Sequence, residues 1–249
     1  MTGKNAAKRT TRRSRGRRVI LLIAGFIGPL LLVPATVSAQ AASSPQGFVL
    51  YKFDGNPNMN HARAKGASFV YIEAAEGIKV NPHFNAAHSG AIAAGLYYGA
   101  FEVARPGESS GTAQAQYFVA HGGGWNNSGM ELPGAVELEA NPSGSSCYDF
   151  SQQALDSWIQ DFATSYHGST GRYPVIITTA GWWLRCTGNY ATPGQNSPLM
   201  ILRWGASPGH LPAGWSSYTF WDHADAGPLP GEQVLFNGDA AALAAFATA

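Results

Sequence analysis

The sequence predicts an α/β fold, most simply a single closed β/α barrel. Short apolar runs rich in β-branched and aromatic residues alternate with longer Ala-rich stretches of helical spacing along the body of the chain. Such alternation in one continuous pass indicates parallel strands with helices packed outside them. An open doubly wound sheet satisfies the same pattern, but no Gly-x-Gly-x-x-Gly follows the first strand, as a nucleotide-binding loop requires. The missing phosphate loop favours the barrel.

Seven strands and five helices are expected in chain order. The strands are GFVLYKF (47–53), SFVYIEA (68–74), LYYGAFEVA (96–104), GAVELEA (134–140), YPVIITTA (173–180), PLMILRW (198–204) and YTFWDHA (218–224). The helices are 59–65, 82–95, 111–121, 151–166 and 239–248. Ser151 and Asp239 are suited to cap the starts of their helices, and Gly95 the end of the second. No long linker divides the body, so residues 42–249 are expected to form one domain.

Residues 1–41 are predicted to be a secretory signal peptide. A tract with eight basic and no acidic residues precedes an apolar run from Val19 to Val33, and the small residues that follow suit cleavage near 39–41. The alternative is a permanent anchor, but a spanning helix needs about 20 apolar residues, and this run has 15, including two glycines and a proline. We therefore expect bacterial export to the outside of the cell, with no stable membrane anchor after cleavage. The Sec and twin-arginine routes both remain open.

The body of the chain is acidic although the whole chain is nearly neutral. Of 16 Lys and Arg residues, the eight in residues 1–41 leave eight against all 15 Asp and Glu, a formal charge of −7. An acidic surface without a basic stripe excludes nucleic acid as the expected partner. With 45% hydrophobic residues and seven Trp, the body can bury a large core, which excludes disorder.

The two cysteines, Cys147 and Cys186, are expected to form a disulfide. Export places them in an oxidising compartment, where a pair of thiols can close. Two buried free thiols are the alternative. Their separation matches no zinc-ligand spacing, and we expect neither a metal site nor a cofactor.

Acidic residues gather where the predicted strands end, and in β/α barrels the reacting groups stand at the carboxyl ends of strands. Glu137 and Glu139 are two residues apart on one strand, so both side chains point to the same face, roughly 6.5–7 Å apart along it. Two carboxyl groups at that range can cleave a glycosidic bond, one giving a proton to the leaving oxygen. The simpler alternative is that both glutamates face water on a half-exposed strand. The other acids at these positions are Glu73, Glu76, Glu102, Asp222 and, in the following segment, Glu232.

Aromatic residues offer a second signal for a sugar site. Flat apolar rings suit pyranose faces, although most tryptophans of a folded domain lie in its core. No more than two or three of the candidates are expected at a site, and these candidates are Trp182, Trp183, Trp204, Trp215 and Trp221. A serine nucleophile is not supported, because the chain has no Gly-x-Ser-x-Gly elbow.

The body resembles glycoside hydrolase family 25, the Chalaropsis-type lysozymes, from about Gly47 to Gly238. The segments that carry the resemblance are SFVYIEAAEG (68–77), GAFEVARP (99–106), SGTAQAQYFVAHGGGW (110–125), LPGAVELEANPSGSSCY (132–148), ITTAGWWLRCTG (177–188) and TFW (219–221). The resemblance implies a secreted, irregular TIM-like β/α barrel. It also implies cleavage of the β-1,4 bond between N-acetylmuramic acid and N-acetylglucosamine in peptidoglycan. We expect the chain to be a monomer.

The resemblance also implies roles for individual residues. Glu139 falls on the general acid, and Glu137 on the carboxylate that holds the acetamido group of the substrate, which acts as nucleophile. Glu232 falls on a further active-site acid, and Cys147 and Cys186 fall where many relatives have a disulfide. The residues expected to bind substrate are Tyr71, Phe101, Glu102, Trp182, Trp221 and Asp222.

The sequence departs from the family at the predicted cleft. The family has an Asp within Gly-x-Asp-x-Ser on its first strand, and Val49 stands there in this chain. Glu102 replaces a His, Phe101 a Tyr, and Asp222 a Gln. Three readings stay open: a muramidase with a remodelled site, a barrel that binds cell-wall glycan without cleaving it, and a hydrolase of another polysaccharide. If the first-strand carboxylate is simply missing, Val49→Asp is expected to restore or increase activity.

Overall fold

The computed structural model describes residues 44–248. The predicted signal peptide and its cleavage site lie outside these residues. In the part of the chain that is described, no helix has the length and apolar character needed to cross a membrane.

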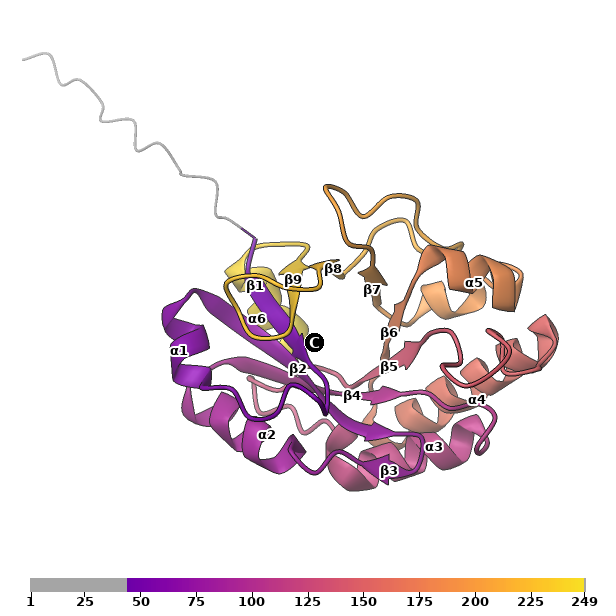
Figure 1. The fold of residues 1–249 in the computed structure, drawn as a ribbon, viewed down its shortest axis with the longest axis horizontal. Coiled ribbons are helices and arrows are strands. Elements are labelled where there is room, and N and C mark those ends of the chain that lie inside the picture. Colours follow the sequence, from indigo (N-terminus) through magenta and orange to yellow (C-terminus); the bar gives the residue numbers. More distant parts are fainter. Residues whose placement is uncertain (1–43, 249) are drawn as a thin grey trace, which may run out of the picture. The chain divides into compact units, whose positions relative to one another are not determined.

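Eight strands within residues 44–248 close into a barrel, which confirms the predicted fold class (Figure 1). Seven of them run parallel and correspond to the seven predicted strands. The eighth, β9, pairs antiparallel with both β8 and β1, and β1 pairs with β2 to complete the closure. The strands are β1 (Gln46–Leu50), β2 (Ala67–Glu76), β4 (Tyr97–Val103), β5 (Ala135–Leu138), β6 (Val175–Thr178), β7 (Leu199–Leu202), β8 (Phe220–Ala224) and β9 (Glu232–Phe236). A two-residue strand, β3 (Lys79–Val80), adds to β2 outside the barrel.

Helices surround the strands, as the alternating pattern predicts (Figure 1). They are α1 (Met59–Ala64), α2 (Phe84–Ala93), α3 (Gly111–Phe118), α4 (Gln152–Thr170), α5 (Ala180–Thr187) and α6 (Ala240–Thr248), with a short π-helix at Val119–Gly123 and a 3₁₀ turn at Thr192–Gln195. The predicted caps are confirmed. The Ser151 side chain accepts a hydrogen bond from the amide of Ala154, and the Asp239 carboxylate accepts one from the amide of Ala242. Gly95 follows α2 with a positive φ of 67°.

Besides the short strand β3 and the 3₁₀ turn, two elements were not predicted, the helix α5 and the strand β9. The run 173–180 was expected to be one strand, but β6 stops at Thr178 and α5 begins at Ala180. The reason is local, because the Thr179 side chain accepts a hydrogen bond from the amide of Trp182 and caps the helix. The strand β9 was missed because its five residues, which follow a Pro/Gly-rich loop, show little alternation of apolar and polar side chains. It becomes a strand because it pairs with β1 and β8 in the folded barrel.

Alternation along each strand separates two cores. Inward residues such as Val49, Phe69, Ile177 and Phe220 fill the barrel. Their outward neighbours pack under the helices, and Phe48 and Val70 are examples. At the amino-terminal end of the parallel strands, α6 adds Leu243 and Ala247 to the inner core. That end is therefore closed by a helix, and the carboxyl ends of the parallel strands are left as the barrel's mouth.

Candidate active site

Five acidic side chains point inward at the mouth of the barrel. Their direction follows from the strands, because each acid lies on the same strand face as an inward core residue or opposite one in the neighbouring strand. Glu137, for example, follows Ala135 by two positions, and Asp222 follows Phe220 by two. Tertiary structure thus brings together acids from four different strands. They are Glu73 on β2, Glu137 on β5 with Glu139 directly after it, Asp222 on β8 and Glu232 on β9.

Glu137 and Glu139 form the centre of this group but differ in exposure. Glu137 is 3% exposed, whereas Glu139 is half-buried and reaches the surface. Burial raises the pKa of Glu137 well above its usual range, and the charge of Glu139 and a hydrogen bond with it raise it further. The alternative in which both glutamates face water is therefore wrong for Glu137. Burial therefore favours the protonated form of the inner member of the pair, whereas the outer member faces solvent.

Asp222 and Glu232 form a second acid pair across β8 and β9. Burial, a hydrogen bond with Glu232 and the charge of Glu232 raise the pKa of Asp222 to about 9. Burial also raises the pKa of Glu232, although hydrogen bonds with Asp222 and Tyr51 oppose that rise. Asp222 is therefore the protonated member at neutral pH, and Glu232 carries the charge of this pair.

Neutral donors, not cations, contact these acids. The Tyr51 hydroxyl donates to Glu232 Oε2 at 3.3 Å, and the Trp204 indole N–H donates to Asp222 Oδ1 at 3.1 Å. The ion pairs among the described residues join Lys52 and Arg105 to Glu76, and Lys79 to Glu108. None involves Glu137, Glu139, Asp222 or Glu232. These four acids therefore form no ion pair among the described residues, although Lys52, Arg105 and Arg203 line the same cavities.

Two cavities meet at these acids. One of about 330 Å³ is lined by Thr179, Leu202, Arg203 and Trp204, and one of about 280 Å³ by residues that include Phe53, Glu76, Arg105 and Glu137. Tyr51, Glu139 and Glu232 line both of them. The rings of Phe53 and Trp204 are 77% and 57% exposed, one in each cavity. A glycan chain can therefore extend into the cavities on both sides of Glu139.

Three of the residues expected to bind substrate lie away from the cavities. Glu102 faces outward, toward the helices, because Phe101 and Val103 take the inward positions on β4. Tyr71 is fully buried inside the barrel, where its hydroxyl donates to the Pro133 carbonyl. Trp221 faces outward on β8 and donates to the Arg203 carbonyl. These three side chains are not part of the site that we propose.

The other predicted residues lie at the mouth or directly beneath it. Phe101 is fully buried, with its ring 5.2 Å from that of Tyr51 at an edge-to-face angle of 83°. Trp182 lines a third cavity beside Glu139. Sequence reasoning missed Tyr51, although it lies in the first predicted strand two positions after Val49 and so shares its face. The strand assignment contained that signal, but not which of the two faces points inward.

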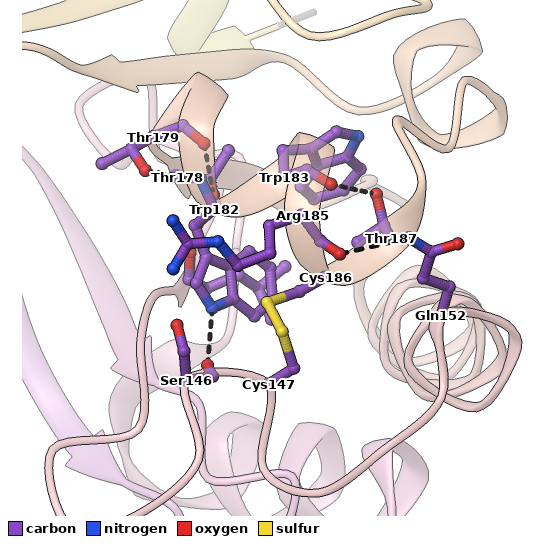
Figure 2. The surroundings of a disulfide bond; sticks show 11 residues. Ser146, Cys147, Gln152, Thr178, Thr179, Trp182, Trp183, Arg185, Cys186 and Thr187 are labelled. Carbon is purple, nitrogen blue, oxygen red and sulfur yellow. Dashed lines mark hydrogen bonds between the residues drawn. A yellow bond between two sulfur atoms is a disulfide. The ribbon is translucent and has the colours of Figure 1, made fainter.

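The predicted disulfide is present and supports the wall of the third cavity. Cys147 and Cys186 are joined with their Cα atoms 5.3 Å apart, closing a separation of 39 residues. Figure 2 shows the bond beside Trp182, whose indole N–H donates to the Ser146 carbonyl at 3.0 Å. A bridge of this loop length stabilises the folded chain by about 4 kcal/mol in the chain-entropy model. It fixes the loop after β5 against α5, next to Glu139.

A β/α barrel with paired carboxyl groups at its carboxyl mouth, between cavities that expose aromatic rings, has the features of a glycoside hydrolase. Residues 50–232 match the sequence profile of glycosyl hydrolases family 25. The chain is 39% identical over 229 residues to an N,O-diacetylmuramidase of Arthroderma benhamiae, which covers 92% of this chain and 97% of the relative. It is 39% identical over 218 residues to Lysozyme M1 of Streptomyces globisporus, which covers 85% and 74% respectively.

A solved structure gives the same result. The muramidase from Acremonium alcalophilum superimposes with a TM-score of 0.81 at 45% identity, over 82% of this chain and 99% of that one. The chain therefore belongs to glycosyl hydrolases family 25, and the resemblance found in its sequence is confirmed.

Proposed function

We propose that the chain is a secreted N-acetylmuramidase, which hydrolyses the β-1,4 bond between N-acetylmuramic acid and N-acetylglucosamine in peptidoglycan. The observation that carries the proposal is the place of Glu139, half-buried at the mouth and in contact with both cavities. The names of the two relatives, N,O-diacetylmuramidase and lysozyme, support peptidoglycan as the substrate. The acidic mouth suits a glycan better than a polyanion.

Glu139 is the proposed general acid. Of the pair on β5 it is the member that reaches both cavities, so its carboxyl group can meet an oxygen that bridges two sugars. Its proton goes to the departing O4 of N-acetylglucosamine as the bond from C1 of N-acetylmuramic acid breaks. Glu139 then takes a proton from the water that attacks C1, which restores the acid and completes the hydrolysis.

Glu137 is proposed to act on the acetamido group of the same sugar, whose oxygen attacks C1 in the first step. In the free protein, burial beside Glu139 raises the pKa of Glu137 and favours its protonated form. An amide N–H that donates to Glu137 favours its charged form. Substrate binding therefore favours release of the proton from Glu137, whose carboxylate then holds the acetamido group in place.

The test compares wild type with Glu139→Gln on a peptidoglycan suspension. Wild type is expected to clear the suspension and to release fragments with muramic acid at the reducing end, as mass spectrometry of the products would record. Glu139→Gln is expected to lose at least about 100-fold, the usual contribution of a general acid. The matched control is Glu108→Gln, because Glu108 is an exposed glutamate whose side chain pairs with Lys79. It should keep wild-type activity.

The two other readings predict different results. If wild type and Glu139→Gln bind cell walls equally and neither releases sugar, the barrel is a glycan-binding module and the proposal is wrong. If wild type cuts chitin or another polymer and leaves peptidoglycan intact, the substrate assignment is wrong although the chemistry stands. Export is proposed from residues 1–41, and is tested by the N-terminal sequence of the protein recovered from the culture medium. That sequence should begin between residues 40 and 42.

A further inference from the structure

Tyr51 lies at the one place where both cavities and both acid pairs meet. It lines each cavity together with Glu139 and Glu232, and its hydroxyl donates to Glu232 Oε2 at 3.3 Å. Burial and the nearby acids Glu137, Glu139, Asp222 and Glu232 all disfavour ionisation of this hydroxyl. The acids come from three strands, β5, β8 and β9, and Tyr51, immediately after β1, is the neutral donor among them.

The ring of Tyr51 is held firmly enough to aim its hydroxyl. Phe53 stacks on one face, with centroids 5.4 Å apart and planes 4° apart, and Phe101 contacts it edge-on at 5.2 Å. The Tyr51 amide donates to Asp54 Oδ2 at 2.8 Å, and the Asp54 amide donates to the Tyr51 carbonyl at 3.0 Å. The turn after β1 and two aromatic rings therefore fix a group that has several rotamers in an open chain.

The residue beneath Tyr51 makes this arrangement necessary. Val49 is the preceding inward residue of β1, 2% exposed and opposite Glu232 in the ladder with β9. Its side chain offers no hydrogen bond to that carboxylate. A partly buried carboxylate without a donor is destabilised relative to one that accepts a hydrogen bond. The Tyr51 hydroxyl supplies this donor from two residues further along the chain, immediately after β1.

We propose that Tyr51 is a positioning residue for the reaction, whose hydroxyl orients Glu232 beside Glu139 at the place where the two cavities meet. The inference rests on the proposed function for its catalytic part. Burial and, after it, the neighbouring acids raise the pKa of the Tyr51 phenol well above its usual range, so the hydroxyl keeps its proton and can donate to Glu232.

Tyr51→Phe removes the hydroxyl and keeps the ring between Phe53 and Phe101. A hydrogen bond to a charged acceptor contributes about 1.5–3 kcal/mol, so kcat on peptidoglycan should fall by about 10- to 100-fold. KM should change by less than about threefold, because the rings that contact substrate remain. The matched control is Tyr190→Phe, which removes the hydroxyl that contacts Gln160 on α4. It should leave both constants unchanged.

A double-mutant cycle tests whether Tyr51 acts through Glu232. If it does, Tyr51→Phe with Glu232→Gln should be no slower than Glu232→Gln alone, within about twofold. If the two losses multiply, Tyr51 acts independently of Glu232 and the inference is overturned. Thermal unfolding of each variant shows whether it is folded, and wild-type-like melting of Tyr51→Phe is expected because the packing is retained.

A titration tests the hydrogen bond without substrate. The titratable groups near the Tyr51 hydroxyl are Glu137 on β5 with Glu139 directly after it, Asp222 on β8 and Glu232 on β9. Asp54, on the turn of Tyr51 itself, accepts from the Tyr51 amide instead. Loss of the donor disfavours the charged form of Glu232, so its midpoint in a ¹³C NMR carboxyl titration should move to higher pH in Tyr51→Phe. It should stay in place in Tyr190→Phe.

The two kinds of failure can be told apart. If wild type releases no sugar, the proposed function is wrong, and the titration alone then supports or overturns the role of Tyr51 in ordering the acids. If wild type is active and Tyr51→Phe changes neither kcat nor the Glu232 midpoint, the inference is wrong and the proposed function stands.

Discussion

The indole N–H of Trp204 donates to the carboxyl group of Asp222 at 3.1 Å, which ties a ring that is 57% exposed in one cavity to an acid with no exposed surface. Asp222 lies opposite Leu202, two residues before Trp204, in the ladder between β7 and β8. The hydrogen bond therefore sets the direction of the ring just beyond the end of β7. A sugar that stacks on Trp204 is held at a fixed height relative to Glu139 and Glu232, which line the same cavity.

Trp204→Ala is expected to weaken glycan binding with little change in the fold. Loss of one aromatic stacking contact corresponds to about tenfold in KM, with kcat less affected. Steady-state kinetics on soluble peptidoglycan fragments measures this split. Leu184→Ala is the control, because Leu184 is 60% exposed and lines none of the cavities at the mouth. Equal KM values for the two variants would show that Trp204 does not bind substrate.

The free energy of unfolding should fall as the pH rises from 5 to 8. Asp222 has a folded pKa of about 9, against about 3.9 in an unfolded chain. Asp222 therefore binds its proton more tightly in the folded state than in the unfolded state. Its contribution to the free energy of unfolding is complete below about pH 4 and is lost progressively as the pH rises toward 9. Glu73, Glu102, Glu137 and Glu232 have raised pKa values and act with the same sign, whereas Glu76 has a lowered pKa and opposes them.

Asp222→Asn isolates the contribution of this acid. The amide oxygen can still accept from Trp204, but the group no longer titrates. Melting temperatures at pH 5 and pH 8 should therefore differ less in Asp222→Asn than in wild type. An identical difference in both proteins would mean that Asp222 titrates normally in the folded state.

Glu102→Met is expected to stabilise the protein at neutral pH. The Glu102 side chain has no exposed surface, and within the part of the chain that is described neither carboxyl oxygen has a hydrogen-bond partner. Burial raises its pKa well above the usual range. Methionine is apolar and of similar length, so it removes the unsatisfied carboxyl group. The free energy of unfolding should rise by about 1–3 kcal/mol. Chemical denaturation at pH 7 measures the change, and the exposed Glu108→Met should be close to neutral. A loss of stability in Glu102→Met would point to a hidden partner.

Val49→Asp is expected to lower activity, which reverses the expectation from sequence alone. The sequence showed a carboxylate missing from the first strand. The structure places Val49 in the barrel core opposite Glu232, under a hydroxyl that already contacts this acid. A further carboxyl group there adds buried like charge without a cation. The rate of sugar release and the melting temperature should both fall. Val49→Thr is the control, because it adds a polar group of similar size that carries no charge. A faster Val49→Asp enzyme would favour the sequence expectation.

The sequence by itself determined the order of the seven parallel strands and of five helices, the barrel class, the disulfide and the family. The strands, helices and family depend on local patterns: apolar runs, cap residues such as Ser151, and motifs that stay together along the chain. The pair Glu137 and Glu139 was also found from its spacing alone, since residues two apart on a strand share a face.

Tertiary structure decided which face of each strand points into the barrel, because an alternating strand has two possible phases and only packing selects one. That choice buried Glu102 beneath the helices, enclosed Tyr71 in the core and turned Trp221 outward. It also brought Tyr51 within reach of Glu232, which is 181 residues further along the chain. Proton occupancy at the mouth depends on burial and on neighbours from other strands, and these exist only once the barrel has closed.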